Sequence, residues 1–248
     1  MPQVNIIRIT ETDSTNRYLS ALCTKQKVAE LTTVLADYQT AGRGQRGNSW
    51  EAERGQNLLF SFVLYPSFLE AKKQFLLSQI ASLAIKEELD NYSEGFSIKW
   101  PNDIYWLEKK ICGILIENDL TGSYISQSIN GIGVNINQDS FHSSAPNPVS
   151  LKQITGKSQD AESILRSILN RVSDYYAMLR KGETTKIAER YHASLFRRNG
   201  MHPYIDKTGQ FTAEIIGIAP EGYLILLDES VTERKYAFKE VSYLLNNH

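Results

Sequence analysis

The stretch FSIKWPNDIYWLEKKICGILIE spans residues 96–117 and predicts strands joined by short turns. Phe96–Trp100 is expected to be a strand that Pro101 stops, because proline fixes φ and lacks a backbone donor. Ile104–Leu107 and Ile111–Glu117 are apolar runs on either side of a charged Glu-Lys-Lys turn, which indicates a β-hairpin. The stretch is therefore expected to lie in a β-sheet.

Strands and helices alternate on both sides of this stretch. Tyr124–Asn137 is expected to be a second pair of strands, broken by Gly131 and Gly133. After Asp160, apolar residues three or four positions apart predict a long helix. Other expected strands are Val4–Ile9, Thr32–Leu35 and Asn57–Tyr65, and other expected helices follow Asp13–Asn16, run from Phe75 toward Leu89 and cover Glu183–Phe196. This order predicts an α+β domain over residues 1–198.

The pattern changes after Gly200, where no helical period remains. Three short strands are expected at Phe211–Ile218, Tyr223–Leu227 and Arg234–Phe238, separated by turn residues. We therefore expect a small all-β barrel over residues 199–248.

Composition excludes several classes of protein. The 248 residues carry 27 Lys+Arg and 28 Asp+Glu, a balance that argues against nucleic-acid binding through phosphate contacts. The N-terminus has no basic segment followed by an apolar one, and no apolar run is long enough to cross a membrane. Only two cysteines are present, and the four histidines lack metal-ligand spacing, so we expect a reducing, cytoplasmic location without a zinc site.

Glycines and arginines alternate in the segment Gly42–Gly47, which formally matches the dinucleotide fingerprint. That fingerprint requires a helix at its third glycine, and no apolar periodicity follows here. Two interpretations remain: a surface loop, or a loop whose Arg43 and Arg46 fold over an anionic ligand.

The segment Lys99–Asp103 and the residue Lys110 are the next candidates. Asn102 and Asp103 could bind Mg²⁺ or a triphosphate, or could simply form a turn. Lys110 is either an exposed charge or a cation for a phosphate whose charge grows in the transition state. Glycines within strands, as at Gly113 and Gly131, mark a bulge or a close approach of a ligand.

Taken in order, these segments resemble the biotin protein ligase family. The resemblance is carried by DSTN at 13–16, QTAGRGQRG at 39–47, KWPND at 99–103, KICGIL at 110–115 and GIGVNIN at 131–137, and it covers essentially the whole chain. It implies a mixed-sheet catalytic domain of the biotin/lipoate ligase type, which is class II synthetase-like, followed by a small SH3-like β-barrel. The chain departs from the family at Gln45 and Asn48, where arginine is common.

The resemblance also implies an activity and its residues. Biotin is activated with ATP and Mg²⁺ to biotinyl-5′-AMP and then transferred to a lysine of a biotin carboxyl carrier domain, such as that of acetyl-CoA carboxylase. Lys110, Arg46 and Asp103 would be catalytic, with Asp103 a base, an orienting group or a metal contact; no protein metal site is otherwise expected. Biotin would contact Ser14, Thr15, Asn16, Gln39, Gly42, Arg43, Gly113, Gly131 and Gly133, and ATP would contact Arg43, Arg46, Trp50, Asn102, Asp103, Lys110 and Asn135.

Two alternative functions stay open from the residues. A lipoate–protein ligase would share the fold and the adenylate chemistry, but polar groups suited to a ureido ring favour biotin. A non-catalytic module that binds biotin or the carrier is the second alternative. Because the Ser-Thr-Asn segment begins at Ser14, we expect no DNA-binding domain, no repressor role and no nucleic-acid or membrane partner; exposed sheet edges make a homodimer plausible.

Overall fold

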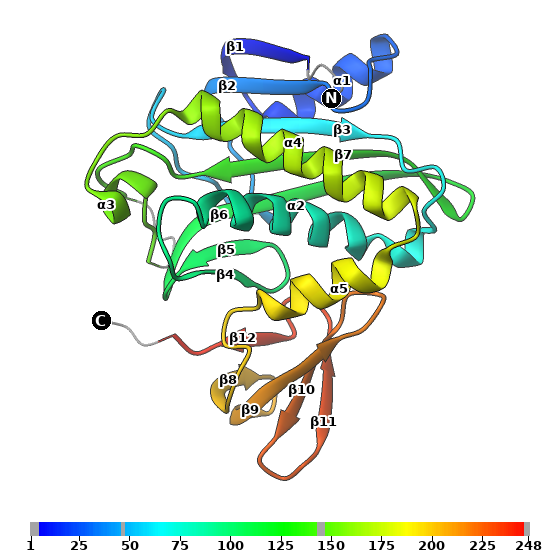
Figure 1. Cartoon of the computed structure of the whole chain (residues 1–248), viewed down its shortest axis with the longest axis vertical. Coiled ribbons are helices and arrows are strands. Elements are labelled where there is room, and N and C mark those ends of the chain that lie inside the picture. Colours follow the sequence, from blue (N-terminus) through cyan, green and yellow to red (C-terminus); the bar gives the residue numbers. More distant parts are fainter. Residues whose placement is uncertain (1–4, 46–47, 143–146, 246–248) are drawn as a thin grey trace.

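The computed structural model describes residues 5–45, 48–142 and 147–245. Its larger sheet has seven strands in the order β1-β2-β3-β7-β6-β5-β4 (Figure 1). Their bounds are β1 (Ile6–Thr12), β2 (Thr33–Gln39), β3 (Leu58–Leu64), β4 (Phe96–Lys99), β5 (Asp103–Trp106), β6 (Lys109–Thr121) and β7 (Tyr124–Val134). Since β1 and β2 are parallel and the other neighbours antiparallel, the predicted mixed sheet is confirmed.

Helices cover the sheet unequally. They are α1 (Thr15–Lys25), the 3₁₀ helix η2 (Ala71–Lys73), α2 (Phe75–Leu89), α3 (Leu151–Thr155), α4 (Ala161–Arg180) and α5 (Thr184–Ala193). Helix α2 packs against α4 and α5 on one face, in front of the sheet in Figure 1. Helix α1 instead contacts β2, β3 and β7, and its Leu19 lies in a separate small core.

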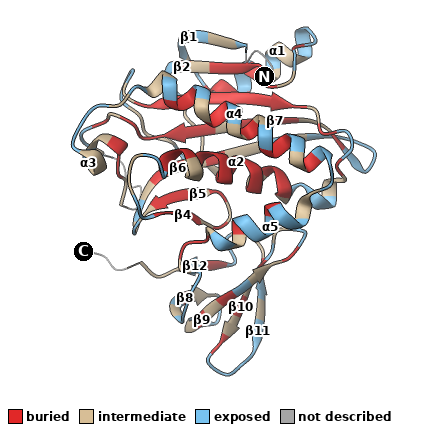
Figure 2. Ribbon diagram, viewed as in Figure 1, coloured by how far each residue is buried: buried red, intermediate tan, exposed pale blue. Residues whose placement is uncertain are grey.

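Strand β3 is buried along its whole length because both faces of the sheet are covered around it. Leu58, Phe60 and Phe62 belong to the main core, which includes α2 and α4. Val63 belongs to the small core under α1. Figure 2 shows buried residues concentrated in α2 and the central strands. The apolar run Leu58–Leu64 is nearly continuous because helices cover the sheet on both faces of this strand.

The prediction of two strands within Tyr124–Asn137 is wrong. One strand, β7, covers Tyr124–Val134 and pairs with both β3 and β6. Gly131 and Gly133 lie in regular register, and the bulge between β6 and β7 falls at Asp119/Leu120 instead. The glycines therefore do not break the strand; they remove side chains from one face of it.

A second, five-stranded antiparallel sheet follows α5. Its strands are β8 (His202–Asp206), β9 (Gly209–Ile218), β10 (Leu224–Asp228), β11 (Glu233–Tyr236) and β12 (Val241–Tyr243), in the order β11-β10-β9-β8-β12. The predicted all-β region is thus confirmed, with β8 and β12 as strands that the sequence pattern missed. Among the described residues, β11 and β12 are edges that do not pair with each other, so a closed barrel is not shown.

The two sheets meet at Trp100. Its indole Nε1 donates a hydrogen bond to the Gly222 carbonyl oxygen at 2.9 Å, and the Phe238 ring lies edge-on to it at 6.3 Å. The smaller sheet is thereby held beside the residues that follow β4. No helix within the described ranges is both long and apolar enough to span a membrane.

Candidate functional site

A single row of residues crosses four strands of the larger sheet. Lys99 lies opposite Asp103, Asp103 opposite Gly113, and Gly113 opposite Gly133. Neighbours such as Ile98 point into the main core on the side of α2, so this row faces the other side. Two of its four members lack a side chain, which leaves a trough on the sheet surface.

This trough is the floor of a cavity of about 820 Å³. Its walls come from the start of α1, the Gly-Arg-Gly segment after β2, the strands β4 to β7, and the segment around β12. The predicted site residues that line it are Ser14, Thr15, Asn16, Gln39, Arg43, Trp50, Asn102, Asp103, Lys110, Gly113, Gly131, Gly133 and Asn135. Gly42 contacts the backbone of Trp50 and does not line the cavity. Arg46 lies outside the described residues.

One end of the cavity holds a cluster of uncharged hydrogen-bonding groups. The Thr15 backbone N–H and hydroxyl both donate to Gln39 Oε1, at 2.7 and 3.1 Å. The buried Ser61 hydroxyl lies 2.7 Å from Thr15 Oγ1 and 2.6 Å from Asn16 Oδ1. Ser14 is the N-cap of α1, yet its side chain makes no capping bond. The hydroxyl of Ser14 therefore stays available to the cavity.

Asn16 explains why residue 131 is glycine. Its Nδ2 donates to Glu117 Oε2 at 2.7 Å and to the Leu115 carbonyl at 3.3 Å. A Cβ at Gly131 would lie only 2.2 Å from Asn16 Oδ1. Because hydrogen bonds hold this amide on both sides, it cannot move away cheaply. Glu117 also pairs with Arg43 at 2.9 Å, so one carboxylate orients two predicted site residues.

Trp50 lies flat over the glycine trough. A Cβ at Gly113 would be 2.9 Å from the ring, and one at Gly133 would be 2.4 Å from it. The Trp50 backbone N–H donates to the Gly42 carbonyl at 3.0 Å. Trp50 Nε1 and Asn135 Oδ1 are buried without a hydrogen-bond partner in the described structure. Buried polar atoms of this kind are costly, so each needs a partner from a water or from a ligand in the cavity.

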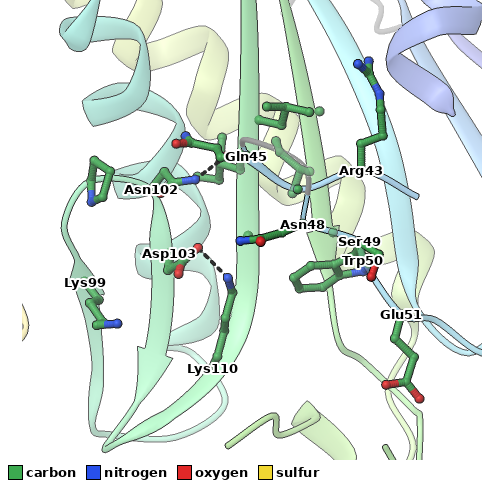
Figure 3. Close-up of a pocket in the computed structure, with 18 of the residues that line it drawn as sticks. Arg43, Gln45, Asn48, Ser49, Trp50, Glu51, Lys99, Asn102, Asp103 and Lys110 are labelled. Atoms are coloured by element: carbon green, nitrogen blue, oxygen red, sulfur yellow. Dashed lines mark hydrogen bonds and ion pairs between the residues drawn. The ribbon is translucent and has the colours of Figure 1, made fainter. Parts of the chain in front are cut away.

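The other end of the cavity is charged. Lys110 Nζ lies 2.8 Å from Asp103 Oδ1 and 5.7 Å from the centre of the Trp50 ring (Figure 3). Asn102 is buried, and its side-chain Nδ2 donates to the Ile114 carbonyl at 2.5 Å. The backbone carbonyl of Asn102 accepts from the Ile114 N–H. Asn102 thus fixes the turn against β6 and offers only its amide oxygen to a ligand. Arg43 points away from the Asp103–Lys110 pair in Figure 3.

No group of three or more His, Cys, Asp or Glu side chains that could hold a metal occurs in the part of the chain that the structure describes. Asp103 lies beside Lys110, and the neighbouring Asn102 lines the same cavity. Mg²⁺ commonly takes one or two protein oxygens together with substrate phosphates. These donors fit an ion that arrives with a nucleotide.

Three residues of the site were not predicted from the sequence. Ser61 and Glu117 act only through residues that are distant in sequence, and no local pattern distinguishes them. Lys99 was part of a quoted motif, but its side chain was given no role. It lines the cavity with Tyr243, which comes from the smaller sheet.

The fold and this site define the class of protein. Residues 9–135 match the biotin/lipoate A/B protein ligase family, and these residues make up about half of the chain. The chain belongs to this family.

Individual proteins of the family are similar to the chain over most of its length. The chain is similar to a biotin–[acetyl-CoA-carboxylase] ligase of Paracoccus denitrificans, with 32% identity over 88% of this chain and 92% of the relative. It is 30% identical to a bifunctional ligase/repressor BirA of Bacillus spizizenii over 84% of this chain, but it spans only 65% of that protein. The structure of a biotin protein ligase from Aquifex aeolicus, in complex with biotin and ATP, has a TM-score of 0.79 and 29% identity, covering 96% of this chain and 97% of that one.

Proposed function

We propose that this protein activates biotin with ATP and transfers it to a lysine of a biotin carboxyl carrier domain. The observation that carries the proposal is a single cavity that has uncharged hydrogen-bonding groups beside the Arg43–Glu117 ion pair at one end and the Asp103–Lys110 pair at the other. Biotin has a neutral ureido ring at one end and a carboxylate at the other, so it matches this polarity. The relatives named above support the same activity.

The uncharged end suits the ureido ring. That ring needs both donors and acceptors. The Ser14 hydroxyl and the Gln39 amide nitrogen face the cavity, and neither has a partner among the described side chains. The hydrogen bonds of Thr15 hold Gln39 in one orientation, which preorganises the site before biotin arrives.

The charged end suits the first reaction. A biotin carboxylate oxygen attacks the α-phosphorus of ATP, the bond from that phosphorus to the bridging oxygen of the β-phosphate breaks, and pyrophosphate leaves with the electron pair. Two anions must approach each other, so a fixed cation is required, and Lys110 is the candidate for this role. Trp50 offers an aromatic face to the base, and Asn135 Oδ1 can accept from an amino group. Mg²⁺, bound to the phosphates and to Asp103, would add charge neutralisation.

The second reaction requires a neutral amine. The carrier lysine has an ordinary pKa near 10.4 and must lose a proton before it attacks the acyl carbon and releases AMP. Asp103 is the candidate helper, because its carboxylate lies at the cavity floor beside Lys110. Trp50 covers the trough and would keep water from the adenylate. Arg46, outside the described residues, remains a predicted phosphate contact.

Several finer expectations belong to the same proposal. We assign residues 1–198 to the catalytic domain and residues 199–248 to an SH3-like domain, on the change from helices and a mixed sheet to short antiparallel strands. Strand β1 is a free edge of the larger sheet among the described strands, which supports a homodimer. A cytoplasmic location fits a free Cys23 and Cys112.

The first experiment is pyrophosphate release from Mg-ATP by the purified protein, with biotin, with lipoate and with neither. We expect release with biotin only, followed by a mass increase of a carrier domain by one biotinyl group. Release with lipoate alone would reassign the substrate. If neither acid causes release of pyrophosphate, the protein is a non-catalytic binding module and not a ligase.

A further inference from the structure

Lys99 is a cation at the edge of the cavity that the proposed function leaves without a role. It ends β4 and lies opposite Asp103 on the face that carries the glycine trough. In Figure 3 it lies on one side of the Asp103–Lys110 pair and Trp50 lies on the other. The row across the sheet therefore continues beyond Asp103 to Lys99, away from the biotin end.

The surroundings of Lys99 are unusual for a lysine. Its ammonium donates to the Tyr105 hydroxyl at 3.3 Å and lies over two aromatic rings, 4.8 Å from the centre of Tyr105 and 5.1 Å from that of Tyr243. Burial lowers its pKa from the ordinary value. Within the described ranges no carboxylate forms an ion pair with it, whereas Lys110 is paired with Asp103. A desolvated ammonium without a carboxylate is costly, and ring faces offset only part of that cost.

Tyr243 belongs to β12 of the smaller sheet, so both sheets shape this position. The ring of Tyr243 also packs against Phe196 and Tyr204, and its hydroxyl is buried without a hydrogen-bond partner in the described residues. The ring therefore positions Lys99 through its face and not through its hydroxyl. Val241 and Lys239 bring the same segment to the cavity wall.

We propose that Lys99 binds the β- and γ-phosphates of ATP and the pyrophosphate that leaves, with Tyr105 and Tyr243 as positioning residues. The inference rests on the proposed function. If Lys110 faces the α-phosphate, the triphosphate continues along the row toward Lys99. The β- and γ-phosphates leave together as pyrophosphate. An unpaired cation beside them stabilises the negative charge that develops on pyrophosphate as its bond to the α-phosphorus breaks.

A phosphate-binding role predicts that Lys99 matters for the formation of biotinyl-5′-AMP and not for the transfer of biotin to the carrier. Biotinyl-5′-AMP has no β- or γ-phosphate, so its transfer to the carrier does not involve the groups that Lys99 binds. A role as the base for the carrier lysine would give the opposite pattern. That role needs an uncharged amine in contact with the carrier lysine, whereas the Lys99 ammonium donates to Tyr105 and lies over the rings of Tyr105 and Tyr243, contacts that suit a fixed cation.

The test uses the full-length protein and compares Lys99→Met with Lys99→Arg. We expect Lys99→Met to raise the KM for pyrophosphate in biotin-dependent ATP–pyrophosphate exchange by about 10- to 100-fold, as for a lost hydrogen bond to a charged group. Transfer from synthetic biotinyl-5′-AMP should stay within about twofold of the wild-type rate, since no lost contact takes part in it. Lys99→Arg should restore part of the pyrophosphate affinity, because it keeps the cation.

Lys235→Met is the matched control. Lys235 also lies over one aromatic ring, 4.7 Å from the centre of Tyr223, but it does not line the cavity. We expect both reactions of this variant to match the wild type. Tyr243→Leu removes the ring face and should also raise the KM for pyrophosphate.

Three outcomes would overturn the inference. An unchanged KM for pyrophosphate in Lys99→Met would remove Lys99 from the phosphate site. Slower transfer from the preformed adenylate, with normal exchange, would make Lys99 a base for the carrier lysine. Absence of biotin-dependent exchange in the wild type would overturn the proposed function itself, a result that the variants cannot produce.

Discussion

The indole of Trp50 lies so close to Gly133 that a methyl group on that glycine would be 2.4 Å from the ring. Gly133 is paired on both sides of β7 and cannot shift, so the absence of its side chain makes room for the aromatic face. A glycine in a central strand costs stability, and here that cost creates a binding surface.

Gly133→Ala should therefore displace Trp50 and weaken ATP binding. Loss of an aromatic face for the base corresponds to about 1–3 kcal/mol, so we expect the KM for ATP to rise at least several-fold. The free energy of unfolding should change little, because the ring belongs to a connecting segment and not to the core. Exchange kinetics and urea unfolding measure the two quantities.

Gly217→Ala is the control, since a Cβ at Gly217 meets no atom within 4 Å. A double-mutant cycle makes the test specific. In a Trp50→Ala background, Gly133→Ala should have almost no further effect on the KM for ATP. An undiminished effect there would show that Gly133 acts on the site without Trp50.

Lys110 and Asp103 should affect different reactions, although they form one ion pair. Lys110→Met should slow adenylation by about 10²- to 10³-fold, as when a fixed donor to a developing charge is removed. Asp103→Asn should slow transfer from preformed biotinyl-5′-AMP, because the carrier amine loses its helper. Single-turnover measurements separate the two steps.

The exposed pair Lys152–Asp139 has a similar distance of 2.7 Å and lies outside the cavity, so Lys152→Met serves as the control. Full transfer activity in Asp103→Asn would rule out Asp103 as base or orienting group. It would leave the role of Lys110 untouched.

Asn16→Asp should destabilise the uncharged end of the cavity. The new carboxylate would replace the Nδ2 that donates to Glu117 and to the Leu115 carbonyl, so the Leu115 carbonyl would lose a donor and two carboxylates would face each other. We expect a loss of about 1–3 kcal/mol in the free energy of unfolding. Glu117→Gln in the same chain should recover part of it by restoring a donor. Urea denaturation measures both changes, and Asn199→Asp, at an exposed position, gives the surface reference.

The smaller sheet should lose stability in acid through Asp206. Hydrogen bonds from Thr208 and Tyr236 lower the pKa of Asp206 to about 2. A depressed folded-state pKa means that the stabilisation is complete above the unfolded value of 3.8 and is lost as the pH falls toward 2. Asp206→Asn should therefore lower stability at neutral pH and flatten its dependence on pH between about 4 and 2. Asp174→Asn, at an exposed position on α4, should leave the slope unchanged, and equal slopes for all three proteins would contradict the assignment.

Much of the local structure followed from the sequence alone. Periodic apolar residues after Asp160 predicted α4, and Pro101 marked the end of β4, because these signals depend on near neighbours in the chain. The order of the motifs indicated the family, since residues that bind one ligand must occur in fixed types and spacings. The glycines at 113, 131 and 133 were predicted to mark a bulge or the close approach of a ligand, whereas in the structure the groups that approach them are the side chains of Trp50 and Asn16.

The tertiary structure alone decided which distant residues share a contact. Glu117 orients Asn16 across about 100 positions of sequence, and Tyr243 meets Lys99 only because the smaller sheet packs beside Trp100. Strand register determined that Lys99, Asp103, Gly113 and Gly133 form one row, and a shift of one residue would have turned each to the opposite face. Register depends on pairing and packing across the whole sheet, so no local pattern could specify it.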